Sequence, residues 1–357
     1  MTRSAAPPST LYDLDLDEFA ELCSDEPRYR VDQIWRGLYT ELRLPSDITT
    51  IPKALRARLD EEAPLALTEL QLQHADRGQT LKWLWKLHDG HQIETVLMLY
   101  PDRATVCVSS QAGCAMACGF CATGQAGFDR HLTTGEIVEQ VVAAARAAGG
   151  RRVSNVVFMG MGEPLANFSN TWKAVERFHG DLGLSARSIT VSTVGLIPGI
   201  RQLTQSALPV TLAVSLHAAN DLLRDELVPI NRRYPLDDLC EAMIEYRERK
   251  GRRVSIEWAL IDGVNDRDGD AHELAAIARR TRSHVNLIPL NPTPGYPVRG
   301  APPKRLYEFR DRLEELGANA TVRRTRGLEI DAACGQLAAR HRSAGASSGT
   351  PVELGRN

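Results

Sequence analysis

Residues 104–121, ATVCVSSQAGCAMACGFC, join a short apolar run to a loop that carries three cysteines. The run ATVCVSS is rich in small and β-branched residues, which is typical of a buried β-strand. Cys114, Cys118 and Cys121 follow it with the spacing Cys-x-x-x-Cys-x-x-Cys, on a loop interrupted by Gly113 and Gly119. This spacing lets three thiolates converge on one centre without a fourth cysteine nearby, which indicates a metal or redox site.

Five more runs of the same kind follow, separated by segments of helical length. They are SNVVFMG (154–160), SITVSTV (188–194), VTLAVSLH (210–217), VSIEWALI (254–261) and HVNLIPLN (284–291). Buried strands that alternate with helices predict a parallel α/β sheet. Six units are too few for a closed eight-stranded barrel. We therefore predict an open, TIM-like partial (βα)6 barrel rather than a doubly wound sheet.

One connecting helix has clear boundaries in the sequence. Thr133 and Glu136 form a capping box in front of IVEQVVAAARAA (137–148), and Gly149 with Gly150 ends the helix. The barrel core is predicted to cover residues 104–342.

Residues 11–78 are predicted to form a small helical domain that could bind RNA. Its helices are expected in LDLDEFAEL (14–22), YRVDQIWRGLYTEL (29–42) and IPKALRARLDEEA (51–63), where Pro52 lies near a first turn. Residues 79–103 are predicted to form a linking β-hairpin, because TLKWLWKL and HQIETVLMLY alternate on either side of Asp89-Gly90. Residues 1–10 and 343–357 are small and polar, and we expect them to be unstructured.

The composition narrows the class of protein. The 357 residues are 43% apolar and 25% charged, with a formal net charge of -2, so any contact with nucleic acid requires local basic patches. No long uncharged apolar run or apolar leader is present, so we expect a cytoplasmic protein without membrane contact. Seven cysteines are an odd number, unlike a secreted disulfide framework, and favour metal or redox chemistry.

Three cysteine ligands would leave one coordination position open. A structural zinc site that uses the three cysteines and His131 is the alternative, since structural zinc is normally closed by a fourth ligand. The loop resembles the signature of the radical S-adenosylmethionine (SAM) superfamily, with Phe120 before the last cysteine. That resemblance implies that Cys114, Cys118 and Cys121 hold a [4Fe-4S] cluster. In the superfamily the fourth iron binds SAM, and the reduced cluster cleaves SAM to methionine and a 5'-deoxyadenosyl radical.

Polar residues at the ends of the predicted strands are candidates for SAM binding. Glycines in GMGEPLAN (160–167) let a backbone approach a ligand closely, and an acidic side chain there suits an ammonium group. The carboxyl edge of strands in barrel-like folds is also where sites are built. The ordinary alternative for each residue is a turn or a loop cap. The candidates are Gly162, Glu163, Ser192, Ser215, Leu216, His217 and Asn291.

A closer resemblance covers residues 28 to about 339. QAGCAMACGFCATGQAGFDR (111–130), GMGEPLAN, VSLHAAND (214–221), and RRTRG (323–327) followed by DAACGQL (331–337) are similar to the RlmN-type 23S rRNA adenine carbon-2 methyltransferases. Carbon 2 of adenine is electron-poor and cannot attack a sulfonium methyl group. The resemblance implies that one SAM methylates Cys334. The radical from a second SAM then removes hydrogen from that methyl group, and the methylene radical adds to the base.

The resemblance also assigns the remaining steps. Glu94 would be the general base that takes the carbon-2 proton. Cys107 would be the resolving thiol that attacks the thioether and forms a transient disulfide with Cys334. Without the resemblance, Cys107 and Cys334 are more simply read as small core residues. Glu94 shares a strand face with Val96 and Met98, an unusual place for a carboxylate, and an exposed charge on an edge strand is the alternative.

The partners implied are 23S rRNA, with tRNA as a second candidate, and an electron donor such as flavodoxin; we expect a monomer. The adenine must be flipped out of its stack to be reached. Candidate RNA contacts are Arg151, Arg152, Arg252, Arg253, Arg323, Arg324 and Arg326, and the aromatic and basic residues of RYRVDQIWRGLY (28–39). The alternatives are solvated arginines and, for Trp35, the packed stripe of an amphipathic helix.

Two rival functions share the same cysteines. One is a Cfr-type enzyme that methylates carbon 8 of adenine, disfavoured by the proline in GMGEPL. The other is a non-catalytic iron–sulfur or zinc module that binds RNA.

Overall fold

The computed structural model describes residues 9–293, 295–323 and 325–337. Within them the chain forms a ten-stranded sheet in the order β1-β2-β3-β4-β7-β8-β9-β10-β11-β12, and β5 pairs with β6 in a separate hairpin. The strands are β1 (Thr68–Ala75), β2 (Thr80–Lys86), β3 (Gln92–Leu99), β4 (Ala104–Cys107), β5 (Gln111–Gly113), β6 (Phe128–His131), β7 (Val153–Phe158), β8 (Ile189–Thr193), β9 (Thr211–Ser215), β10 (Ser255–Leu260), β11 (His284–Pro289) and β12 (Asn319–Val322).

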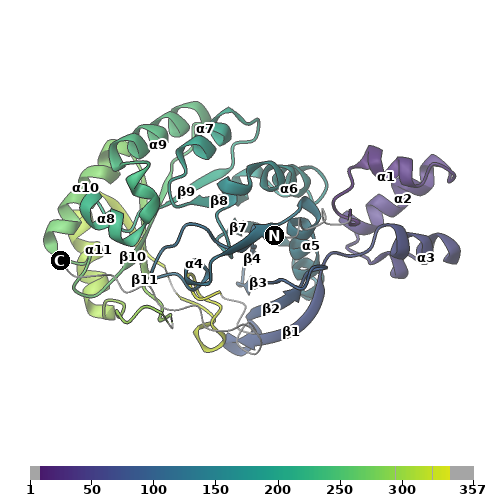
Figure 1. Cartoon of the computed structure of the whole chain (residues 1–357), viewed down its shortest axis with the longest axis horizontal. Coiled ribbons are helices and arrows are strands. Elements are labelled where there is room, and N and C mark those ends of the chain that lie inside the picture. The colour runs from purple at the N-terminus through teal and green to yellow at the C-terminus, as the bar shows by residue number, and fades with distance from the viewer. Residues whose placement is uncertain (1–8, 294, 324, 338–357) are drawn as a thin grey trace, which may run out of the picture.

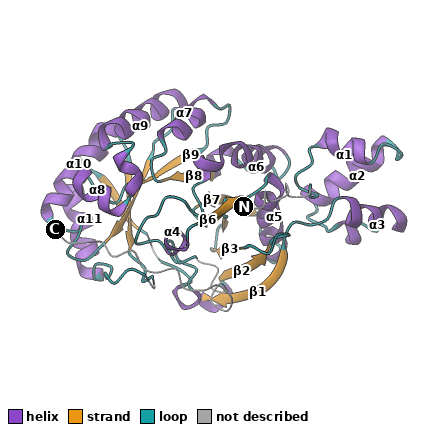
Figure 2. Ribbon diagram, in the orientation of Figure 1, coloured by secondary structure: helices purple, strands orange, loops and turns teal. Residues whose placement is uncertain are grey.

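From β4 onward every neighbouring pair of strands is parallel, and each crossover adds the next strand on the same side. The sheet curls into a partial barrel, and the long helices that connect its parallel strands lie outside it (Figures 1 and 2). The six predicted strands and the predicted open barrel are confirmed. β12 is a seventh parallel strand that the sequence analysis missed, because its four residues, NATV, carry no long apolar run.

The helices of the barrel pack against a core of branched side chains. Val156, Val191, Leu212 and Ile256, from four neighbouring strands, are completely buried. The helices are α4 (Ala122–Ala126), α5 (Thr134–Ala147), α6 (Phe168–Gly180), α7 (Ile197–Gln205), α8 (Asp221–Leu227), α9 (Leu236–Lys250), α10 (Asp268–Thr281) and α11 (Pro303–Glu315). Short 3-10 turns occur at Pro45–Asp47, Asp76–Gly78, Pro164–Asn167, Ala186–Ser188, Pro229–Arg232 and Leu328–Ile330.

The predicted capping box of α5 is confirmed. The Thr133 hydroxyl accepts from the Glu136 N–H at 3.1 Å, and the Glu136 carboxylate accepts from the Thr133 N–H at 2.9 Å. Gly149 follows the helix with a φ of 62°, a conformation that favours glycine.

Three N-terminal helices form a lobe beside the barrel (Figure 1): α1 (Leu16–Leu22), α2 (Arg28–Tyr39) and α3 (Lys53–Glu62). The Trp35 ring lies 5.8 Å from Phe19 and 4.7 Å from Tyr39, and its N–H donates to Asp181 at 3.0 Å. The packing interpretation of Trp35 is therefore the one that the structure supports. The hydrogen bond of Trp35 therefore connects the N-terminal lobe to the end of α6 in the barrel.

Two predicted boundaries of the N-terminal region are wrong. Residues 68–75 form strand β1, which pairs with β2 in antiparallel fashion, so the helical part ends at Glu62 instead of residue 78. The alternation in TELQLQHA follows the two-residue period of a strand. Thr10 is buried and donates to Asp13 at 2.7 Å, so the first ten residues are not all unstructured. Residues 1–8 and 343–357 lie outside the described part of the chain.

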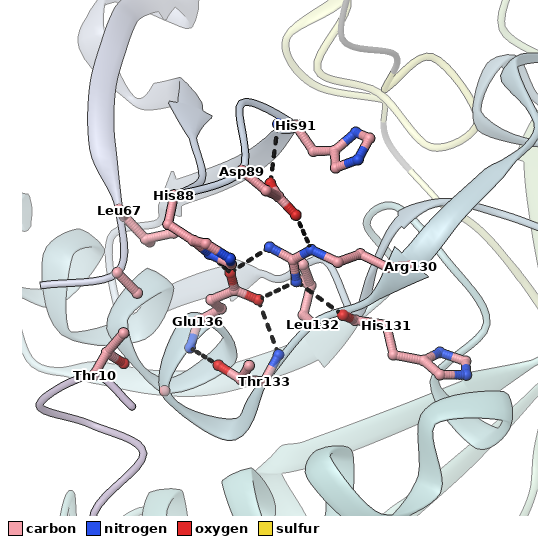
Figure 3. A network of polar contacts seen from close by, with 12 residues as sticks. Thr10, Leu67, His88, Asp89, His91, Arg130, His131, Leu132, Thr133 and Glu136 are labelled. Atoms are coloured by element: carbon pink, nitrogen blue, oxygen red, sulfur yellow. Dashed lines mark hydrogen bonds and ion pairs between the residues drawn. The ribbon is translucent and has the colours of Figure 1, made fainter. Parts of the chain in front are cut away.

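A network of charged groups fixes the β2–β3 hairpin to the segment that follows the cysteine loop (Figure 3). Arg130 on β6 donates to both oxygens of Glu136 at 2.8 and 2.7 Å, and it also binds Asp89 in the hairpin turn. His88 lies 3.8 Å from the Glu136 carboxylate. Bidentate guanidinium–carboxylate pairs hold a defined geometry. The network therefore sets the position of the strand that carries Glu94 relative to the cysteine loop.

In the part of the chain that the structure describes, no helix has the length and apolar character needed to cross a membrane.

Candidate active site

A cavity lies at the carboxyl ends of the parallel strands, where the predicted site residues meet. It holds about 1060 Å³ of space free of protein atoms, open solvent included. We call it the strand-end cavity. Among its lining residues are Cys114, Cys118, Cys121, Gly162, Glu163, Ser192, Ser215, His217, Asn291 and Cys334.

Leu216 is the one predicted SAM-binding residue that does not line this cavity. Its side chain is completely buried, because successive residues at a strand end point to opposite sides. Its backbone is also engaged, since its N–H donates to the Glu257 carbonyl at 3.0 Å and its carbonyl accepts from Arg224 at 3.1 Å.

The glycines of GMGEPLAN are also required by the packing of the protein itself. A Cβ on Gly160 would lie 2.6 Å from the Val108 carbonyl oxygen, and a Cβ on Gly162 would lie 2.5 Å from the Gln111 side chain. Gly162 also has a φ of 100°. The need for glycine thus comes from the close packing of the loops after β7 and β4, and not only from a ligand.

Gly162→Ala is expected to destabilise the fold by about 1–3 kcal/mol more than Gly150→Ala. Both glycines have positive φ, so both variants carry backbone strain, but nothing lies within 4 Å of a Cβ on Gly150. The difference is the cost of overpacking, which is typically about 1–3 kcal/mol. Chemical denaturation of the two variants measures it, and equal midpoints would show that the Gly162 contact is not tight.

Glu163 is a buried carboxylate at the wall of the cavity. Its two oxygens accept from the Leu165 N–H at 3.0 Å and the Val194 N–H at 2.9 Å. Burial raises its pKa to about 7, although these backbone donors oppose the rise. A buried acid between two strand ends can receive a cationic group from a ligand.

His217 is held in one orientation and one tautomer. Its Nδ1 accepts from the Ala259 N–H at 2.9 Å, so Nε2 carries the ring proton. Burial, helped by the nearby Arg224, lowers its pKa to about 3. Its backbone has a φ of 58°, and the ring meets Phe120 edge-on at 4.8 Å. His217 therefore presents a neutral N–H donor next to the cysteine loop.

The three loop cysteines are free thiols on the wall of the strand-end cavity. Burial raises the pKa of Cys114 to about 12 and raises that of Cys118 as well. A buried thiol becomes a thiolate when it binds a metal. Three soft thiol donors fit an iron–sulfur cluster, in which each cysteine binds a different iron.

The zinc alternative is not supported. His131 lies on β6, where its Nδ1 is 3.0 Å from the Gln111 amide nitrogen and its ring packs on Phe128. It is not among the residues that line the strand-end cavity. No group of three His, Cys, Asp or Glu side chains in the described ranges is close enough to hold a single metal ion.

A second, smaller cavity adjoins the first, and we call it the thiol cavity. Cys107, Cys334, Met159 and Arg323 are among its lining residues, and Cys334, Met159 and Asn291 line both cavities. The Asn291 side chain donates to the Cys334 carbonyl at 3.0 Å, which fixes the loop that carries this thiol. Cys334 is therefore not an ordinary core cysteine. Both thiols are free, so the disulfide implied by the resemblance is not present in this structure.

Glu94 is buried, so its interpretation as an exposed charge on an edge strand is wrong. Its carboxylate lies 2.9 Å from the Lys82 ammonium, and Lys82 also lies 3.4 Å from the Asp331 carbonyl in the Cys334 segment. Glu94 shares a strand face with Val96 and Met98, which line the thiol cavity. Sequence reasoning missed Lys82, although a lysine inside the apolar run TLKWLWKL was a signal.

The candidate RNA-binding arginines do not gather in one place. Arg323 and Arg326 line the thiol cavity, and the Arg326 guanidinium lies 4.2 Å from the Tyr100 ring. Arg252 precedes β10, at the opposite edge of the sheet from the strand-end cavity, and donates to the Thr211 hydroxyl at 2.7 Å. Arg152 donates to the Gly183 carbonyl at 2.7 Å. Arg324 lies outside the described residues.

Comparisons with known proteins identify the family of this chain. A model of the Radical SAM superfamily matches residues 108–275. The probable dual-specificity RNA methyltransferase RlmN of Salinispora tropica is 51% identical, over 94% of this chain and 95% of the relative. The corresponding protein of Chloroflexus aurantiacus is 50% identical, over 93% of each chain. The crystal structure of a radical SAM methyltransferase from Sphaerobacter thermophilus has a TM-score of 0.90 and 50% identity, over 93% of this chain and 100% of that one.

The partial barrel and the three-cysteine loop at its carboxyl edge define a radical SAM enzyme, whose cofactors are a [4Fe-4S] cluster and SAM. Within that superfamily the chain belongs to the RlmN family of methyltransferases. The expected enzyme class is confirmed, and the alternative of a non-catalytic module is set aside.

Proposed function

We propose that this enzyme methylates carbon 2 of an adenine in 23S rRNA and uses two SAM molecules for each methyl group that it transfers. The observation that carries the proposal is the position of Cys334, which lines both the strand-end cavity with the loop cysteines and the thiol cavity with Cys107. A side chain so placed can take a methyl group on one side and react with a base on the other.

Cys334 would carry the methyl group through the reaction. Its thiol loses a proton, and the sulfur takes a methyl group from the first SAM, which leaves as S-adenosylhomocysteine; the side chain thereby becomes a thioether. The cluster, when bound, supplies the electron that cleaves the second SAM to methionine and a 5'-deoxyadenosyl radical. The thioether methyl gives one hydrogen atom to that radical, and the remaining methylene adds to carbon 2 of the adenine. A radical route is needed because this ring carbon is not a nucleophile.

Glu94 would remove the proton from carbon 2. After addition the adduct must lose this proton and one electron to restore the ring. The cluster, when bound, would take the electron back, and a carboxylate on the strand face that lines the thiol cavity is a suitable base. A buried carboxylate needs a charged partner to remain ionised. The Lys82 ammonium at 2.9 Å supplies it, which supports the assignment.

Cys107 would release the product. Its thiolate attacks the Cys334 sulfur, the bond from that sulfur to the new methylene carbon breaks, and a proton on that carbon completes the methyl group. The resulting Cys107–Cys334 disulfide is reset by cellular thiols. Burial raises the pKa of Cys107 to about 12, and the Arg323 guanidinium opposes that rise, so Arg323 supports thiolate formation.

We extend the proposal to the remaining partners. A tRNA adenine is a second substrate, in line with the dual specificity in the names of the relatives. A flavodoxin-like protein supplies electrons, and the enzyme works as a monomer in the cytoplasm.

Analysis of methylated nucleosides tests the proposal. The reconstituted enzyme is incubated without oxygen with SAM, a reductant and either 23S rRNA or total tRNA, and the digested RNA is examined by mass spectrometry and NMR. We expect 2-methyladenosine from both RNAs. A methyl group at carbon 8 would assign the Cfr-type reaction instead, and RNA without new methyl groups would refute the proposed activity.

A further inference from the structure

Arg224, on α8, is a completely buried cation behind the cysteine loop. Its guanidinium donates to the Leu216 carbonyl at 3.1 Å, the Val194 carbonyl at 2.6 Å and the Asn231 amide oxygen at 2.7 Å. All three acceptors are neutral. None of the ion pairs formed among the described residues includes Arg224.

The nearest carboxylates on α8 do not bind the Arg224 guanidinium directly, because another side chain lies between them. Asp221 and Asp225 accept from the Asn231 side-chain amide at 2.9 and 2.7 Å, so the amide stands between them and the guanidinium. Burying a charge is costly unless an opposite charge compensates it. The fold thus keeps a positive charge in its interior, and the two nearest carboxylates on α8 bind Asn231 and not the guanidinium itself.

The position of this charge relates it to the cluster site. Cys118 packs in one buried group with Ala218, Leu227 and Val228, and Leu223 lies against that group. Arg224 therefore lies on α8 between Leu223 and Leu227, two residues that belong to or pack against the buried group that contains Cys118. Val194, whose carbonyl accepts from Arg224, lines the strand-end cavity.

We propose that Arg224 is a positioning residue that holds a positive charge near the cysteine loop. This charge makes the [4Fe-4S] cluster easier to reduce. Three thiolates give the cluster a net negative charge, and reduction adds one more. A fixed cation in a region of low dielectric stabilises the reduced form more than the oxidised form. The inference requires the cluster but does not depend on the RNA substrate or on the carbon that is methylated.

Redox titration of the purified, cluster-loaded protein, followed by electron paramagnetic resonance without SAM or RNA, tests this inference. In Arg224→Gln the reduction equilibrium should become about tenfold less favourable, equivalent to about 59 mV to more negative potential for one electron. Arg224→Lys retains the charge and should stay near the wild-type potential. Arg232→Gln removes an exposed cation from the adjacent turn Pro229–Arg232 and should have little effect, because solvent screens it.

A second variant keeps the test decisive where Arg224→Gln does not fold or does not hold iron. The double change Asn231→Asp with Asp225→Asn leaves the net charge of the protein unaltered but moves a carboxylate next to the guanidinium. This charge swap should also shift the potential to a more negative value. A wild-type potential in the iron-loaded charge-swap protein, or in iron-loaded Arg224→Gln, would overturn the inference and would show that Arg224 only ties α8 to the strand ends.

Discussion

Replacing Cys107 with alanine is expected to leave substrate RNA covalently bound to the protein. In the proposed reaction Cys107 alone opens the thioether between Cys334 and the base, so its loss stops the cycle after the carbon–carbon bond has formed. Product formation should end, and about one RNA per active chain should be trapped, as for other covalent intermediates that cannot be resolved. A denaturing gel with labelled RNA, followed by mass analysis of the digested adduct, measures this species.

Matched cysteine variants serve as controls for that experiment. Cys334→Ala should form no adduct, because the attachment atom is missing. Cys240→Ala should behave as the wild type, since Cys240 is buried on α9 and lines neither cavity. Failure to recover any RNA–protein species from an active preparation of Cys107→Ala would argue against the thioether route.

The second large effect concerns the metal centre. Cys118→Ala should reduce the iron content from about four per chain to background and abolish SAM cleavage, because two remaining thiolates cannot hold the cluster. Iron analysis and the visible spectrum of protein purified without oxygen measure the loss.

Cys334 provides the informative comparison, since it lines the same cavity as the three loop cysteines. If it were a fourth cluster ligand, no iron would remain open to bind SAM. We therefore expect Cys334→Ala to keep its full iron content. The variant should also still cleave SAM when no RNA is present in the assay. Loss of iron from this variant to the level of Cys118→Ala would mean that the cluster is closed.

The barrel and the metal centre could be predicted from the sequence because their signals are local. β-branched runs identify buried strands, the Thr133–Glu136 pair marks a helix start, and the three-cysteine spacing identifies the loop. β1 escaped detection although its sequence alternates, because the strand is largely exposed and contains few apolar residues. β12 escaped detection because it has only four residues. The sequence alone was sufficient to predict those features whose pattern lies within a single segment of the chain.

The electrostatics of the site could not be predicted in this way, because they depend on contacts between distant segments. The Lys82–Glu94 ion pair crosses a hairpin, and the Arg224 contact with Val194 joins residues 30 positions apart. The role of Gly162 likewise depends on Gln111, which belongs to another loop. Burial of charged groups only becomes visible once the fold has brought these segments together.

The most direct test of the two-SAM route is the fate of a SAM methyl group that carries three deuterium atoms. The enzyme is loaded with this SAM, and the RNA product and 5'-deoxyadenosine are analysed by mass spectrometry. Passage through Cys334 predicts a product methyl group with two deuteriums and one deuterium in 5'-deoxyadenosine. A product methyl group that retains all three deuteriums, with none in 5'-deoxyadenosine, would contradict the proposed reaction.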